Sequence, residues 1–165
     1  MLIRTALALA FSIALLNLTA VLAPANAADP ENTLVIELKS GPVRIELLPK
    51  LAPKHVARVK QLARDGYYNG VKWHRVISGF MAQTGDHTGT GTGGSKYGNL
   101  PLEASSYVYR RGTVGAARTS DPNTANSQFF ICLDDSGCRG LTGQYTVWGQ
   151  VISGMENVDK VKTGA

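Results

Sequence analysis

Much of the chain consists of short segments in which apolar and polar residues partly alternate, a period that is typical of strands with one buried face. Residues 33–38 and 42–48 flank Lys39-Ser40-Gly41 and predict a β-hairpin. The further predicted strands are residues 73–77, 79–83, 113–117, 128–133 and 146–152. Their spacing is that of hairpins rather than of alternating strands and helices, which favours a closed or nearly closed antiparallel barrel.

Two helices are predicted beside these strands. Pro53 suits the first turn of a helix, where its missing N–H costs nothing, and apolar residues follow at helical spacing until Gly66. Residues 155–162 predict a short closing helix. Residues 86–98 are rich in glycine and almost without apolar side chains, so we expect a long loop there. The loop contains the letters of a G-x-G-x-x-G motif, but no helix follows, and we therefore expect no dinucleotide site.

The first 27 residues have the features of a secretory signal peptide. Arg4 precedes an apolar run at residues 6–16, and Ala25-Asn26-Ala27 provides small residues for cleavage before residue 28. An uncleaved membrane anchor is the alternative, disfavoured by the polar residues late in the segment and by the cleavage site. We expect a signal peptide at 1–27, one domain at 28–165, a periplasmic or secreted protein, and no membrane association after cleavage.

Composition excludes several classes of function. The chain of 165 residues is 44% hydrophobic and 18% charged, which is typical of one folded domain and not of a disordered chain. The net charge of +5 is spread along the sequence without a run of five or six like charges, so we expect no nucleic-acid partner.

Metal and hydrolase chemistry find little support in the sequence. The two cysteines and three histidines lack the spacing of a zinc site, and we expect no metal and no cofactor. A triad of Ser127, His74 and Asp86 would lack the G-x-S-x-G turn that presents a nucleophilic serine. Cys132 and Cys138 leave two alternatives open, which are a disulfide across a short loop, or a buried thiol at Cys132 with a free loop thiol at Cys138.

Two segments carry polar residues beside large apolar ones. Residues 73–83 place Arg75 inside an alternating strand, close to a phenylalanine, a methionine and a glutamine. Residues 127–131 add a second glutamine and two phenylalanines on another strand. The pattern fits an ordinary core with an exposed arginine as well as an apolar surface pocket beside one fixed cation, and composition does not separate the two.

Longer motifs favour the surface pocket over the ordinary core, because they resemble those of a known protein family. The runs WHRVISGFMAQTGD, GTGGSKYGNLPLE, SQFFICL and LTGQYTVWGQVISGMENVDKV occur in this order, and residues 33–162 resemble the cyclophilin family of peptidyl-prolyl cis–trans isomerases. The GAART stretch and the signal peptide are most similar to bacterial periplasmic members. The resemblance implies a mainly β fold, an antiparallel eight-stranded barrel capped by two helices, with the active groove on its outer face.

The resemblance also implies the site and its partners. Arg75 matches the catalytic arginine of the family. The implied substrate-binding residues are His74, Phe80, Met81, Gln83, Ala117, Gln128, Phe130, Leu141 and Tyr145. The expected function is isomerisation of X-Pro bonds in exported proteins, with proline-containing polypeptides as partners. The alternative is a proline-motif binding module or holdase chaperone with little turnover.

Three departures from the family pattern change the expectations. Gly140 stands where some members carry a tryptophan, so we expect weak cyclosporin binding. Arg118 replaces an asparagine that is common in eukaryotic members. Family members continue past the closing helix into a last strand, whereas this sequence supplies seven predicted strands, so we expect a fragment, an open barrel, or a barrel completed by a partner.

Overall fold

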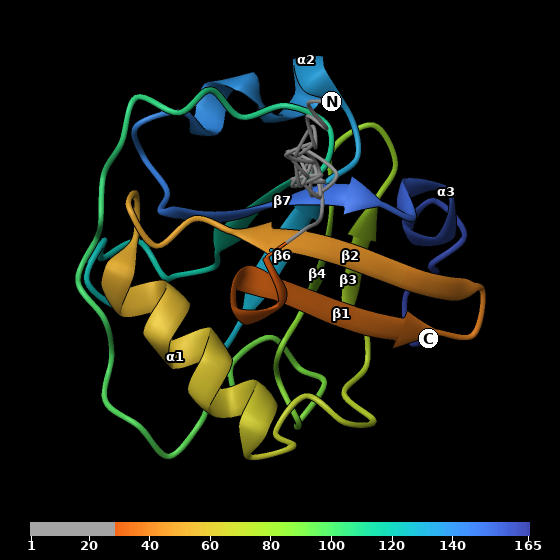
Figure 1. Cartoon of the computed structure of the whole chain (residues 1–165), viewed down its shortest axis with the longest axis horizontal. Helices are drawn as coiled ribbons and strands as arrows, with labels where there is room; N and C mark the ends of the chain where they lie inside the picture. Colours follow the sequence, from red (N-terminus) through yellow and green to blue (C-terminus); the bar gives the residue numbers. More distant parts are fainter. Residues whose placement is uncertain (1–28) are drawn as a thin grey trace, which may run out of the picture.

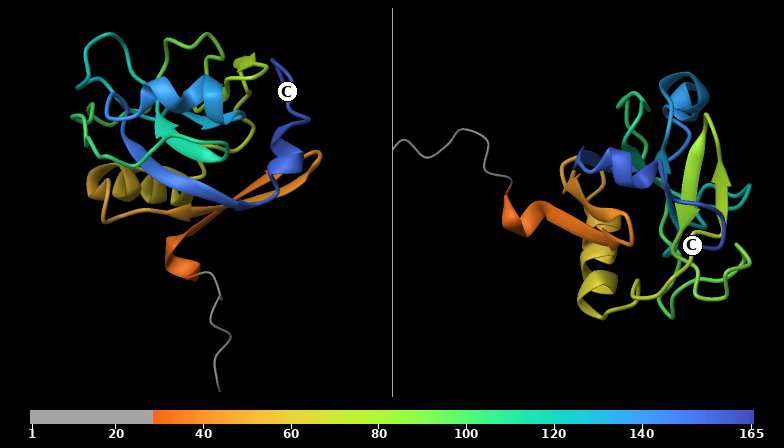
Figure 2. Two further views of the ribbon diagram at one scale, coloured as in Figure 1. Left: turned by 90° about the horizontal axis from the view of Figure 1, so that it is seen from above. Right: turned by 90° about the vertical axis from the view of Figure 1, so that its right-hand side faces the viewer.

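The computed structural model describes residues 29–165, in which seven antiparallel strands form one sheet. The strand order is β1-β2-β7-β5-β6-β4-β3, and the sheet curls into a half-barrel (Figures 1 and 2). The strands are β1 (Thr33–Leu38), β2 (Gly41–Leu47), β3 (Arg75–Ile77), β4 (Met81–Thr84), β5 (Thr113–Ala116), β6 (Phe129–Cys132) and β7 (Val147–Ser153). The helices are α1 (Pro53–Arg64), α2 (Asp135–Cys138) and α3 (Met155–Val158), with 3₁₀ turns η1 (Pro30–Asn32) and η2 (Arg139–Leu141).

The alternating pattern of β2 produces the first wall of the core. Val43, Ile45 and Leu47 are buried, and the residues between them are exposed. On one side β2 pairs with β1 in the predicted hairpin, and on the other it pairs with β7. The turn requires a glycine at position 41, where φ is 128° and an added Cβ would lie 2.8 Å from the Asn157 amide.

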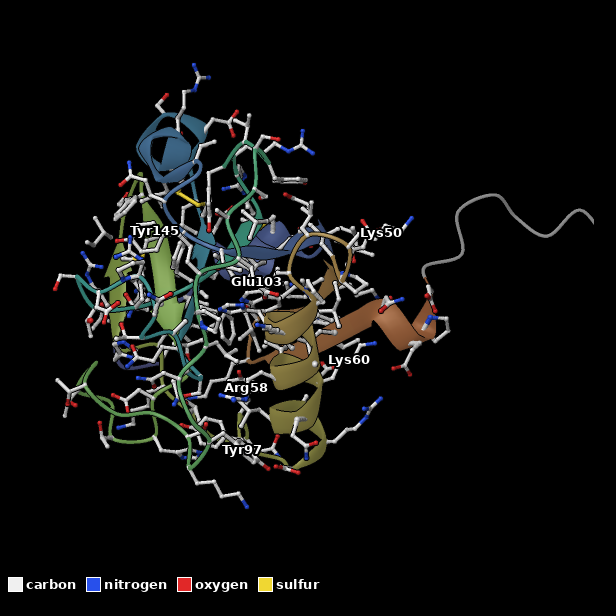
Figure 3. The ribbon with its side chains drawn as sticks, turned by 90° about the vertical axis from the view of Figure 1, so that its left-hand side faces the viewer. Lys50, Arg58, Lys60, Tyr97, Glu103 and Tyr145 are labelled. Atoms are coloured by element: carbon white, nitrogen blue, oxygen red, sulfur yellow. A yellow bond between two sulfur atoms is a disulfide. The ribbon has the colours of Figure 1, made fainter. Side chains whose placement is uncertain are left out.

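Helix α1 covers one end of the core with Val56, Val59 and Leu62 (Figure 1). The residue before it, Ala52, has no side chain that could cap the helix. The carboxylate of Glu103 takes that role from a distant loop, because it accepts hydrogen bonds from the N–H groups of Lys54 and His55, both at 3.0 Å (Figure 3). This loop is thereby tied to the start of the helix.

The observed elements confirm most of the predicted ones. All seven strands lie within about two residues of their expected bounds, and residues 86–98 contain no helix and no strand. The closing helix ends at Val158, earlier than expected, because residues 159–160 form a turn and residues 161–162 have no regular secondary structure. Among the described residues the sheet is open, with β1 and β3 at its edges.

The segment after β6 was not predicted. Residues 135–141 form α2 and η2, and Asp134 caps α2 by accepting hydrogen bonds from the N–H groups of Ser136 and Gly137. Cys132 and Cys138 form a disulfide, so the alternative of a free loop thiol is wrong: Cys138 is fully buried at the end of α2. The predicted signal peptide lies outside the described residues, and in residues 29–165 we find no helix with the length and apolar character needed to cross a bilayer.

Candidate active site

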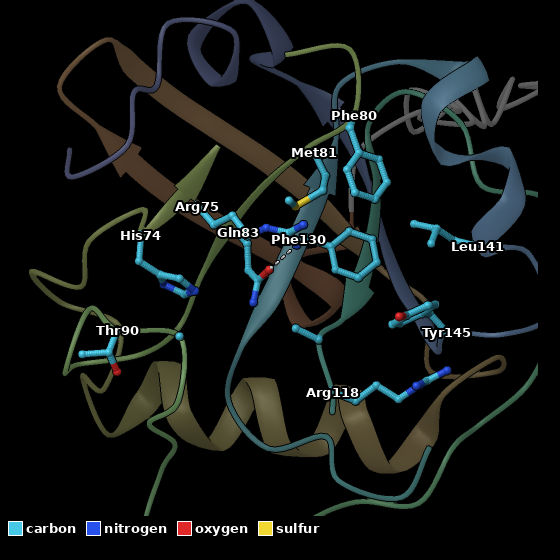
Figure 4. A pocket seen from close by; sticks show the side chains of 12 residues that line it. His74, Arg75, Phe80, Met81, Gln83, Thr90, Arg118, Phe130, Leu141 and Tyr145 are labelled. Carbon is cyan, nitrogen blue, oxygen red and sulfur yellow. Dashed lines mark hydrogen bonds between the residues drawn. The ribbon is translucent and has the colours of Figure 1, made fainter. Parts of the chain in front are cut away.

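A cavity of about 430 Å³ opens on the outer face of the sheet (Figure 4). Its lining residues are His74, Arg75, Phe80, Met81, Gln83, Thr90, Gly91, Ala117, Arg118, Phe130, Leu141 and Tyr145. They come from β3, β4 and β6 and from the loops between strands, so the antiparallel order of the sheet brings them together. None of them carries a carboxylate, a thiol or a serine hydroxyl.

Arg75 lies at the start of β3, directly opposite Gln83 of β4. Its side chain is exposed, and its Nη1 donates a 3.4 Å hydrogen bond to Oε1 of Gln83. The amide of Gln83 donates in turn to Oε1 of Gln128 at 2.9 Å. An arginine with a single weak side-chain contact keeps most of its five N–H groups available to a ligand.

The apolar wall of the cavity is formed around Phe130. Met81 and Phe130 are buried on neighbouring strands, and the ring of Tyr109 stacks behind Phe130 with centroids 5.8 Å apart. Tyr145 meets Phe130 edge to face at 5.9 Å, and Leu141 completes the wall from η2. These contacts hold a rigid hydrophobic hollow beside the guanidinium of Arg75.

The glycine-rich loop after β4 borders the cavity and is held by a buried carboxylate. Asp86 is 1% exposed and accepts hydrogen bonds from the N–H groups of Thr88, Gly91 and Gly93. Burial alone would raise the pKa of Asp86, but these hydrogen bonds and that of the Thr88 hydroxyl outweigh burial and hold the pKa well below its usual range. The loop therefore folds around a permanent negative charge.

Gln128 connects this loop to the arginine. Its Nε2 donates to the carbonyl oxygens of Gly91 and Gly93 at 2.9 and 2.8 Å, and its Oε1 accepts from Gln83. Gln128 is not among the residues that line the cavity. In the structure Gln128 supports Gln83 from behind, and its predicted contact with the substrate stays a prediction.

All the other residues predicted for the site lie around the cavity. Thr90 and Gly91 also line the cavity and were not predicted, and Arg118 was predicted only as a departure from the family pattern. The glycine-rich loop was the available signal for the first two, because its short side chains allow the backbone to approach a ligand. Nothing in the sequence identified Asp86 as the residue that organises this loop.

The structure does not assemble the alternatives considered for this region. Ser127 donates to the carbonyl of Gly85 at 2.7 Å, and Asp86 is turned into its own loop, so the two form no triad with His74. No group of three or more potential metal ligands occurs in residues 29–165. The cavity offers instead a fixed cation, amide groups and an apolar hollow.

Comparison with known sequences agrees with this chemistry. The family model for cyclophilin type peptidyl-prolyl cis-trans isomerase/CLD matches residues 33–165. A probable peptidyl-prolyl cis-trans isomerase of Brucella suis is 55% identical over 174 residues, covering 99% of this chain and 87% of the relative. A peptidyl-prolyl cis-trans isomerase of Helicobacter pylori is 38% identical over 132 residues, covering 78% of this chain and 79% of the relative.

Solved structures show the same fold. A cyclophilin from Hirschia baltica has a TM-score of 0.72 at 30% identity, covering 84% of this chain and 70% of its own. A cyclophilin type isomerase from Cryptosporidium parvum, solved in the presence of the dipeptide Ala-Pro, has a TM-score of 0.72 at 35% identity, covering 78% of this chain and 84% of its own. On the family match and these similarities, the chain belongs to the cyclophilin-type peptidyl-prolyl cis–trans isomerases.

Proposed function

We propose that this isomerase uses Arg75 to accelerate X-Pro isomerisation in exported proteins and thereby assists their folding. The observation that carries the proposal is the exposed guanidinium of Arg75 beside the apolar hollow of Phe130. A structurally similar isomerase was solved in the presence of the dipeptide Ala-Pro, which supports the choice of proline as the group that enters the hollow.

Isomerisation requires rotation about the peptide bond that precedes proline. Amide resonance opposes the rotation with a barrier of about 18–20 kcal/mol, so uncatalysed X-Pro isomerisation takes about tens to hundreds of seconds. The catalyst must bind the twisted amide more tightly than either planar form. No bond is broken, and no nucleophile, metal or cofactor is required for that.

Arg75 is suited to this task. Twisting removes resonance from the proline nitrogen, which becomes pyramidal and able to accept a hydrogen bond. A guanidinium is always charged and presents its donors in a rigid fork. With the proline ring in the hollow formed by Phe130, Met81 and Leu141, water is displaced and the contact with Arg75 strengthens. Removing about 7 kcal/mol of the barrier would give about five orders of magnitude in rate.

The polar side of the cavity can guide the carbonyl that precedes the proline. The amide of Gln83 is fixed from behind by Gln128, and the N–H of Ala117 is already bonded to the Gln128 carbonyl at 2.9 Å. Ala117 therefore has its carbonyl left for a peptide N–H. In this proposal Arg75 acts on the nitrogen, and Gln83 orients the rotating group.

The test is Arg75→Ala in an isomerase assay on an X-Pro peptide. We expect kcat/KM to fall more than about tenfold while the melting temperature stays unchanged, because the exposed arginine makes only one side-chain hydrogen bond within residues 29–165. Arg44→Ala is the control, since Arg44 is exposed on β2 and does not line the cavity. Equal activity in the Arg75 variant and the wild type would refute its role, whereas tight peptide binding with little turnover in the wild type would support the holdase alternative.

Export and cyclosporin affinity are tested separately. The features of residues 1–27 support export, which predicts that the mature protein begins at Ala28 and fractionates with the periplasm or the medium. N-terminal sequencing that finds Met1 retained would contradict cleavage.

The weak cyclosporin binding that we propose rests on Gly140, which presents no side chain where some relatives carry an indole. A tight dissociation constant for cyclosporin would contradict this proposal.

A further inference from the structure

A second arginine lines the same cavity, on the side away from Arg75. Figure 4 shows Arg118 and Tyr145 on one side of Phe130 and His74 and Arg75 on the other. No lining residue is acidic, and within residues 29–165 neither arginine forms an ion pair. The cavity therefore carries two positive charges with no neutralising carboxylate among its walls.

Arg118 is held in place by neutral groups. Its Nη1 donates to the carbonyl oxygens of Thr119 and Ser120 at 2.8 and 3.4 Å, and its Nη2 donates to that of Gln144 at 3.0 Å. Its guanidinium carbon lies 4.2 Å from the ring centroid of Tyr145. Carbonyls and an aromatic face orient a guanidinium without cancelling its charge.

This arrangement favours an anion in the cavity. A guanidinium that is already immobilised loses little conformational freedom when it binds a carboxylate, so more of the attraction is retained as affinity. Three of its five N–H groups are used by the carbonyls. Of the other two, that on Nε is buried without a hydrogen-bond partner in residues 29–165, and one on Nη2 remains for a ligand. The buried carboxylate of Asp86 is turned toward the N–H groups of its own loop, and within residues 29–165 it forms no ion pair with Arg118.

We propose that Arg118 is a specificity residue that makes this isomerase prefer substrates with an aspartate or glutamate next to the X-Pro bond over substrates with a lysine or arginine there. The inference rests on the proposed function, because it requires the proline to occupy the hollow beside Phe130. A peptide residue spans about 3.5 Å, so an acidic residue within about two positions of the proline can reach the wall that carries Arg118.

The experiment compares three otherwise identical peptides with Glu, Gln or Lys beside the proline, placed before it in one set and after it in another. Isomerisation is measured by NMR exchange, so that no coupled protease adds its own preference. At low salt we expect kcat/KM in at least one set to be about fivefold or more higher for the Glu peptide than for the Lys peptide, since each charge contributes about twofold to fivefold. The preference decreases toward unity at about 0.5 M salt, because the cavity is open to solvent.

Variants of Arg118 test whether this side chain causes the preference for the Glu peptide over the Lys peptide. In Arg118→Gln we expect the Glu-to-Lys ratio to fall at least about threefold, and in Arg118→Lys, which keeps the charge, we expect it to be largely retained. Arg44→Gln removes the same charge from the exposed face of β2 and leaves the ratio unchanged. A ratio near one in the wild type, or an unchanged ratio in Arg118→Gln, overturns the inference.

The outcomes also separate this inference from the proposed function. Catalysis of the Gln peptide without any charge preference overturns the role of Arg118 and leaves the isomerase function intact. Failure of the wild type to isomerise any of the peptides overturns both. If Arg118→Gln does not fold, the inference is still tested by the Glu-to-Lys ratio of kcat/KM in the wild type, by the salt dependence of that ratio, and by the ratio in Arg118→Lys.

Discussion

The side chains behind the cavity matter as much as those that line it. Asp86 binds the glycine-rich loop, the loop carbonyls of Gly91 and Gly93 bind Gln128, and Gln128 positions Gln83 beside Arg75. Gly93 has to be a glycine here, because a Cβ would collide with the Asp86 carboxylate. A buried residue behind the cavity wall thus sets the orientation of the groups that are proposed to contact the substrate.

Asp86→Asn tests this chain of contacts. The substitution keeps the shape but places an NH₂ group against backbone N–H groups, so we expect a loss of about 1–3 kcal/mol of unfolding free energy. We expect kcat/KM to decrease about threefold to tenfold, because Gln128 and Gln83 lose their support. Chemical denaturation and the isomerase assay measure the two effects.

The matched control is Asp121→Asn on a nearby exposed loop. Within residues 29–165 the Asp121 carboxylate accepts a single hydrogen bond, from the N–H of Asn123 at 2.8 Å, and Asp121 does not line the cavity. We expect its unfolding free energy to stay within about 0.5 kcal/mol of the wild type. Similar effects from the two substitutions would show that Asp86 has no special role.

Among the elements, α2 and η2 form the support of one cavity wall. The disulfide between Cys132 and Cys138 ties α2 to β6, and η2 ends at Leu141 of the cavity. Gly137 of α2 packs so closely on the turn before β4 that an added Cβ would collide with the carbonyl of Gly79. The turn carries Phe80, so the position of α2 and that of a cavity residue depend on each other.

Two glycine substitutions separate this packing from helix propensity. Gly137→Ala forces α2 or the Gly79 turn to move, and we expect a loss of about 1–3 kcal/mol in unfolding free energy together with lower kcat/KM. Gly140→Ala meets no atom within 4 Å, and neither glycine has a positive φ. We therefore expect Gly140→Ala to be neutral or stabilising by up to about 1 kcal/mol. Equal behaviour of the two variants in denaturation experiments would exclude the packing argument.

These elements also show what the sequence could and could not predict. Strands such as Thr33–Leu38 were predictable because their alternation reflects one half-buried face, and the site residues were predictable because they stand in family motifs. The α2–η2 segment was not, because Asp134 and Gly137 act through a cap and a close approach that leave no periodic signal. The role of Asp86 depends on the path of a loop, which residue order alone does not determine.

Across the whole molecule, one buried pair joins α1 to the long loop that precedes β5. Nδ1 of His55 lies 2.6 Å from Oε2 of Glu103, and His55 is 3% exposed. Burial lowers the pKa of His55 and is opposed only in part by the hydrogen bond to Glu103. Nε2 of His55 is buried without a hydrogen-bond partner in the part of the chain that the structure describes. The folded protein therefore favours the neutral imidazole.

This pair makes the stability of the protein sensitive to acid. Below the unfolded pKa of about 6.5, the unfolded chain takes up a proton that folded His55 resists, so stability decreases as the pH falls. We expect full stability above about pH 6.5 and a loss of at most about 1.4 kcal/mol per pH unit below it. In His55→Asn, which keeps a donor for Glu103 but does not titrate, that slope should be smaller. Denaturation at several pH values measures both proteins, and identical slopes would refute the assignment.

The order of strands in the sheet determines how late in synthesis the cavity can form. Strand β2 pairs with β7, and the cavity combines side chains from His74 to Tyr145, so its walls come together only through contacts between distant parts of the chain. Topologies dominated by such distant contacts fold slowly, in about milliseconds to seconds. A nascent polypeptide whose β7 is still inside the ribosome lacks the strand that pairs with both β2 and β5. The proposed assistance to other chains can therefore begin only after the protein itself has been synthesised and folded through β7, its last strand in the described residues.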